Sequence, residues 1–139
     1  MAGFFIWMKL MRFTVVVQSA PFDSTAAANA CDTVASLLRQ GHEVFRLFFY
    51  RDGVFNASAK AVPPQNLPDL PRQWQALIEN HALDAVVCVS SALQRGILTE
   101  GEASRYEKAG STIQQGFTLG GLGLLVEALG EADRVLTFG

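Results

Sequence analysis

The sequence has few charged residues and no excess of basic ones. Charged side chains make up 17% of its 139 residues, the formal net charge is −2 and the pI is about 5.6. Binding to nucleic acid through its phosphates requires a basic surface, because Lys and Arg must neutralise those phosphates. We therefore predict no direct contact with nucleic acid.

Cysteine and histidine are also scarce. The chain has two cysteines, Cys31 and Cys88, and two histidines, His42 and His81. Two cysteines form neither a disulfide framework nor a four-ligand zinc site, and the two histidines lack metal-ligand spacing. We expect no metal ion and no cofactor, and a reducing cytoplasm as the location.

The sequence also lacks a long apolar run and a phosphate-binding loop. The apolar residues 1–11 are too short to span a membrane, and they lack the basic start and cleavage site of a secretory signal. We treat them as an N-terminal extension, either a functional arm or sequence ahead of a true start at Met8 or Met11.

The glycine-rich residues 116–123 match neither the dinucleotide-binding fingerprint nor the P-loop. This disfavours a flavin- or nucleotide-binding domain, and we expect these glycines to serve close helix packing or a subunit contact.

Strand and helix patterns alternate over residues 12–139, a length suited to one domain. Apolar and β-branched runs predict strands at residues 12–18, 43–50, 83–89 and 133–138, with a turn at Asp52-Gly53. Helical spacing and capping residues predict helices that begin at Ser24 or Thr25, at Asp69 or Pro71, at Ser90, at Thr99 and near Leu119. This order predicts a single-domain α/β sandwich, with a mostly parallel sheet flanked by helices on both faces. Half of the residues are hydrophobic, so we also expect apolar surface to be buried against other subunits.

Cys88 lies near the end of a predicted apolar strand, where functional groups collect in open parallel sheets. It precedes the expected helix cap Ser90 by two residues, so backbone N–H groups and the helix dipole could stabilise a thiolate there. Arg95 is the nearest cation in the sequence. The alternative is that Cys88 is an inert strand residue. Cys31 shares the apolar face of a predicted helix and is expected to be a small buried hydrophobe.

Short motifs in a characteristic order give the chain a resemblance to a known family. They are Gly41-His-Glu43, Phe48-Phe-Tyr50, Asp52-Gly-Val54, Cys88-Val89, Arg95-Gly96, Gly116-Phe117, Gly121-Leu-Gly123 and Asp133-Arg134-Val135. With them, residues 11–139 resemble the DsrE/TusD family of sulfur-relay proteins. Gly120 departs from the family pattern, which has Ser at that position.

The resemblance implies a sulfurtransferase in which Cys88 accepts a persulfide sulfur and hands it to a partner protein. In TusD-like proteins the sulfur reaches the wobble uridine of tRNA, from a TusA-like donor and through a TusE-like acceptor. In DsrE-like proteins it feeds dissimilatory sulfur oxidation with a DsrC-like partner. Residues 114–119 look TusD-like, whereas residues 100–105 and the ending Phe138-Gly139 look DsrE-like.

The resemblance also implies an assembly. Such chains form a hexamer with two copies of each of three related subunits, here with TusB/TusC-like or DsrF/DsrH-like sister chains. A non-catalytic interaction subunit, in which Cys88 is buried and only the surface matters, is the competing interpretation.

Overall fold

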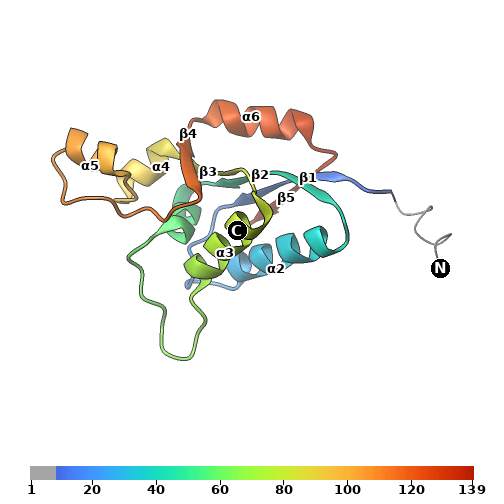
Figure 1. The fold of residues 1–139 in the computed structure, drawn as a ribbon, viewed down its shortest axis with the longest axis horizontal. Coiled ribbons are helices and arrows are strands. Elements are labelled where there is room, and N and C mark those ends of the chain that lie inside the picture. The colour runs from blue at the N-terminus through green and yellow to red at the C-terminus, as the bar shows by residue number, and fades with distance from the viewer. Residues whose placement is uncertain (1–8) are drawn as a thin grey trace.

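The computed structural model describes residues 9–139, and the strands within this range form one parallel sheet between two layers of helices (Figure 1). The strands are β1 (Arg12–Val17), β2 (Glu43–Phe49), β3 (Ala85–Cys88), β4 (Phe117–Gly120) and β5 (Arg134–Phe138). Their order is β4-β3-β2-β1-β5, and every neighbouring pair is parallel. The predicted α/β sandwich is therefore confirmed.

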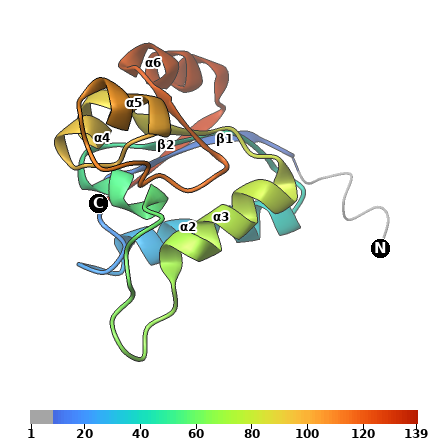
Figure 2. The same cartoon turned by 60° about the vertical axis from the view of Figure 1, so that its left-hand side comes forward.

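Three longer helices cover the two faces of the sheet. Helices α2 (Ala26–Arg39) and α3 (Leu70–His81) lie on one face, and α6 (Leu122–Glu131) lies on the other (Figures 1 and 2). The shorter helices are the 3₁₀ helix η1 (Arg51–Ala57), α4 (Val89–Gln94) and α5 (Glu100–Arg105). No helix within residues 9–139 is both long and apolar enough to cross a membrane.

Two of the expected helix caps, Asp69 and Thr99, form side-chain hydrogen bonds, whereas Thr25 lies at the N-cap of α2 without one. Asp69 accepts a hydrogen bond from the Arg72 N–H at the start of α3, at 3.3 Å. Thr99 accepts one from the Glu102 N–H at the start of α5, at 3.2 Å. Such bonds satisfy N–H groups that the first helical turn leaves without partners.

The core lies mainly between the sheet and the α2–α3 layer. Trp74 of α3 is fully buried, and its ring packs edge-on against Phe49 of β2, with centroids 5.1 Å apart. The Trp74 indole N–H donates to Oδ1 of the buried Asn56, at 3.1 Å, and the Asn56 amide donates to the Ser19 and Gly53 carbonyls. These paired buried polar groups join η1, which follows β2 in the chain, to α3 and to the segment after β1.

Three local predictions differ from the structure. Asp52-Gly53 does not form an isolated turn but the first turn of the 3₁₀ helix η1, closed by a bond from the Gly53 N–H to the Tyr50 carbonyl at 2.9 Å, and Gly53 approaches the backbone of β1 too closely for any side chain. The expected helix from Leu119 is preceded by the strand β4, and α6 begins only at Leu122. Ser90 is not a helix cap, because β3 runs directly into α4 and leaves Cys88 at the N-cap position.

Residues 1–8 of the expected N-terminal extension lie outside the described residues. Of the remaining three, Met11 donates its backbone N–H to Nδ1 of His42 at 3.0 Å. This bond connects the chain just before β1 with the residue just before β2.

Candidate functional site

A cleft of about 450 Å³ opens at the carboxyl ends of β2 and β3. The residues that line it come from the end of β2, the β3–α4 junction and the start of α6: Tyr50, Arg51, Cys88, Ser90, Ser91, Gln94, Arg95 and Leu122. This is the edge at which an open parallel sheet collects its functional groups. The sequence-based placement of Cys88 at this edge is therefore correct, whereas its role is a separate question.

Cys88 forms part of the inner wall of this cleft. Its residue is 2% exposed, and it clusters with Phe48 and Val86 on the face of the sheet that α6 covers. Leu124 and Leu125 of α6 pack against that cluster. Cys88 thus contributes to the lining of the cleft while it is almost fully buried, and Leu122, which is 49% exposed, also lines the cleft.

Arg95 lines the cleft, as its position in the sequence suggested, but its charge is shared. Its Nε donates to Oδ1 of Asp52 at 2.8 Å, and its Nη1 donates to the Ser91 carbonyl at 3.2 Å.

The sequence analysis did not identify Tyr50 and Arg51, which directly follow β2 and line the same cleft. Their position after a strand was the signal that could have found them.

Arg46 fixes the helix that covers Cys88. This β2 residue is 8% exposed, and its guanidinium donates to Oδ2 of Asp84 at 2.7 Å and to Oε1 of Glu127 at 2.8 Å. It also donates to the Leu124 carbonyl at 2.8 Å. Burial acts to lower the pKa of Arg46, but these hydrogen bonds raise it above its usual value, so the side chain stays charged. Arg46 thus ties α6 to the sheet beside the site.

Gly120 allows α6 to approach the sheet closely. It pairs with Cys88 across β3 and β4, and a Cβ atom added to it would lie 2.5 Å from Cδ1 of Leu124 and 2.7 Å from Cγ1 of Val86. Those distances are shorter than any ordinary contact, so this glycine serves close packing, as we expected of the glycine-rich segment. The serine of the family pattern would push Leu124 away from its present position.

Cys31 is a residue of α2 and lies on the opposite side of the sheet, on the face of α2 that packs into the core. It is 6% exposed and packs in the main core cluster. Burial, and to a smaller extent the Asp32 carboxylate, raises the pKa of the Cys31 thiol to about 12. The prediction that Cys31 is a buried hydrophobe is consistent with this environment.

We expect Cys31 to resist thiol reagents in the folded protein, because both burial and the raised pKa suppress its thiolate. At about pH 8, iodoacetamide should label Cys31 only after unfolding in urea, as peptide mapping would show. Since the pKa in the fold exceeds the unfolded value of 9.0, this group's contribution to stability is complete below pH 9 and declines as the pH rises towards 12. Rapid labelling of Cys31 in the native protein would contradict the prediction.

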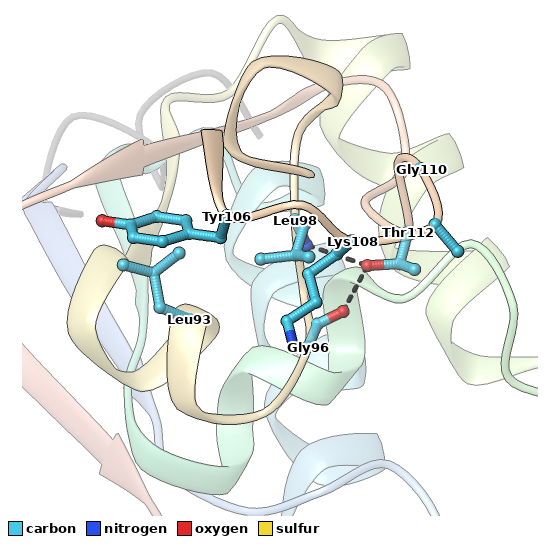
Figure 3. A pocket seen from close by; sticks show the side chains of 8 residues that line it. Leu93, Gly96, Leu98, Tyr106, Lys108, Gly110 and Thr112 are labelled. Carbon is cyan, nitrogen blue, oxygen red and sulfur yellow. Dashed lines mark hydrogen bonds between the residues drawn. The ribbon is translucent and has the colours of Figure 1, made fainter. Parts of the chain in front are cut away.

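A second hollow, of about 490 Å³, lies between α4 and the loop that follows α5 (Figure 3). Leu93, Leu98 and the ring of Tyr106 form its apolar wall. The Thr112 hydroxyl donates to the Gly96 carbonyl and accepts from the Leu98 N–H, which closes the loop. Neither cysteine lines this hollow, whereas Cys88 lines the cleft at the carboxyl ends of β2 and β3.

The fold and the cleft together define a small parallel α/β protein that presents one cysteine at the carboxyl edge of its sheet. The chain belongs to the DsrE/DsrF-like family, which it matches over residues 11–138. It is 43% identical over 129 residues to a protein of Allochromatium vinosum named "Putative sulfurtransferase DsrE", covering 93% of this chain and 99% of that protein. It is 45% identical over 129 residues to the "Sulfurtransferase TusD homolog" of Pseudomonas aeruginosa, covering 93% and 98%.

A solved structure confirms the fold independently. The ychN protein from E. coli superposes with a TM-score of 0.75 at 22% identity, covering 93% of this chain and all of that one. At this identity the likeness concerns architecture alone.

Proposed function

We propose that this chain is a sulfurtransferase subunit that carries sulfur as a persulfide on Cys88 and passes it to a partner protein. One observation carries the proposal: of the two cysteines, Cys88 lines an open cleft while Cys31 is enclosed in the core. The names of both relatives, each a sulfurtransferase, support a role in sulfur relay.

The chemistry needs no cofactor and one thiol that a partner can reach, and Cys88, although 2% exposed, is the thiol that lines a cleft. The Cys88 thiolate attacks the terminal sulfur of a donor persulfide, a new S–S bond forms, the old one breaks, and the donor leaves as a thiolate. An acceptor thiolate then takes the terminal sulfur from Cys88 in the same manner. No oxidant is consumed, because the transferred sulfur keeps its oxidation state.

The arrangement of the two cysteines protects the carried sulfur. A neighbouring thiol would attack the inner sulfur of the persulfide, form a disulfide with Cys88 and release sulfide. Cys88, at the end of β3, lies on the face of the sheet that α6 covers, whereas Cys31, on α2, packs in the core on the other face. The sheet itself therefore stands between the two thiols.

For the destination of the sulfur we propose thiolation of the tRNA wobble uridine in the cytoplasm, with a TusA-like donor and a TusE-like acceptor. The relative named as a TusD homolog supports this assignment. The relative named DsrE supports the alternative, transfer to a DsrC-like partner in sulfur oxidation. In either pathway the chain itself makes no direct contact with nucleic acid.

An apolar stripe on α6 supports assembly with TusB/TusC-like or DsrF/DsrH-like sister chains in a hexamer. Leu122, Val126 and Leu129 recur at helical spacing on α6 and are 49%, 68% and 45% exposed. Contiguous exposed leucine and valine on a helix favour burial against another subunit.

Sulfur loading of the full chain tests the proposal. Incubation with a persulfide donor, followed by peptide mass analysis under non-reducing conditions, should place one additional sulfur atom on the peptide that contains Cys88. Loaded protein mixed with a TusE-like or a DsrC-like acceptor should then lose this sulfur to the correct partner. A chain that takes up no sulfur at Cys88 would exclude the proposed function.

A further inference from the structure

The backbone of Arg51 is held in an unusual conformation beside Cys88. Its φ of 52° lies in the left-handed region, which most residues with a side chain avoid. Its N–H donates to Oγ of Ser91 at 3.1 Å, which ties the residue to the helix that follows Cys88. Non-glycine residues held in this region concentrate at functional sites.

The Arg51 side chain is placed against the wall of the cleft. Its guanidinium carbon lies 5.6 Å from the centroid of the Tyr50 ring. Tyr50 in turn packs against the cluster that contains Cys88, and all three residues line the cleft. The ring therefore provides a platform that keeps the guanidinium near the cleft.

The two arginines of the cleft differ in their charge balance. Arg95 forms an ion pair with Asp52. Within residues 9–139, no carboxylate lies within ion-pair distance of Arg51. The positive charge that the cleft offers to a ligand therefore comes from Arg51.

We propose that Arg51 binds the negatively charged terminal sulfur of the incoming donor and guides it to Cys88. This inference rests on the proposed function and names the ligand class, a persulfide anion on a protein or small thiol. When the Cys88 thiolate attacks such an anion, two negative charges must approach, so repulsion opposes formation of the new S–S bond. A fixed guanidinium offsets this repulsion, and it also stabilises the persulfide anion left on Cys88 once the donor thiolate departs.

Alkylation of Cys88 by two reagents of different charge tests the role of Arg51 without any transfer of sulfur. Iodoacetate is anionic and iodoacetamide is neutral. The rate of alkylation of Cys88 by iodoacetate, divided by the rate with iodoacetamide, therefore reports the local charge. In Arg51→Asn this ratio should fall about tenfold, because electrostatic attraction is lost. Asn tolerates the left-handed backbone, so the fold should be retained. Arg51→Lys should keep most of the ratio.

Arg105→Asn is the matched control. Arg105 lies 5.3 Å from the Tyr106 ring centroid, in a similar stacking arrangement, but on α5 and away from the lining of the Cys88 cleft. This variant removes the same charge and should leave the ratio unchanged. The rate of sulfur loading from a persulfide donor should fall in Arg51→Asn and not in Arg105→Asn.

The outcomes separate the two proposals. If Arg51→Asn keeps both the wild-type ratio and the wild-type loading rate, the inference about Arg51 is overturned while sulfur carriage by Cys88 stands. If wild-type Cys88 takes up no sulfur, the proposed function is overturned. The proposed role of Arg51 in sulfur transfer is then overturned as well. A lowered ratio together with slower loading supports the inference.

Discussion

Cys88→Ser should lower sulfur loading and onward transfer by roughly 100-fold or more, because the other cysteine, Cys31, is enclosed in the core. Serine is nearly isosteric with cysteine, so the cleft should keep its shape. The measurement is the rate at which a persulfide donor loads the chain, followed by transfer to an acceptor protein. Far-UV circular dichroism would establish that the variant is folded.

Cys31→Ser is the matched control for this experiment. Both cysteines are buried, at 6% and 2% exposure, so each substitution places a hydroxyl in an apolar site at a cost of about 1–3 kcal/mol in stability. If Cys88→Ser loses transfer and Cys31→Ser does not, the loss is therefore due to the missing Cys88 thiol and not to reduced stability of the fold. If Cys88→Ser transfers sulfur as fast as the wild type, the chain is an interaction subunit and not a sulfur carrier.

Gly53→Ala should produce the largest loss of stability among small substitutions near the site. The added Cβ would lie 1.9 Å from the Val17 carbonyl oxygen and 2.7 Å from its carbon. Both are backbone atoms of the sheet, so no side-chain rotation relieves the overlap, and η1 must move away from β1. We expect a loss of about 3 kcal/mol in the free energy of unfolding, measured by urea denaturation.

The same substitution should also disturb the cleft. The Val17 carbonyl accepts the Tyr50 N–H at 2.9 Å, and Gly53 donates its own N–H to the Tyr50 carbonyl at 2.9 Å. Displacement of η1 therefore shifts Tyr50, which lines the cleft. Gly130→Ala in α6 is the control, since nothing lies within 4 Å of its added Cβ, and it should stabilise the helix by up to about 1 kcal/mol. A loss in Gly53→Ala no greater than about 0.5 kcal/mol would contradict the proposed packing.

The sequence predicted those features that local patterns encode. Apolar runs alternating with helical spacing specify a parallel sheet, and parallel strands end at a common edge. Cys88 was therefore placed correctly, since the end of its strand is visible in the sequence. Cys31 was placed correctly by the periodicity of its helix.

The incorrect predictions share a physical cause. β4 has four residues, two of its positions are only partly buried, and Gly120 ends it, so its pattern is too short to distinguish from a helix start. Asp52-Gly53 has a typical turn composition, but contact with β1 and pairing through Asn56 stabilise η1 there. In each case a contact with a strand distant in the sequence decides the structure, since β4 pairs with β3 and Gly53 of η1 packs against β1.

The sequence by itself determined the fold class and the position of Cys88 at the carboxyl edge, because both follow from periodicity within single elements. Only the tertiary structure decided the surroundings of that thiol. It paired Arg95 with Asp52, and it placed Arg51 over Tyr50 beside the cleft. The physical reason is that charge pairing and burial depend on which side chains of β2, α4 and α6 are in contact. Such contacts produce no periodic pattern in the sequence.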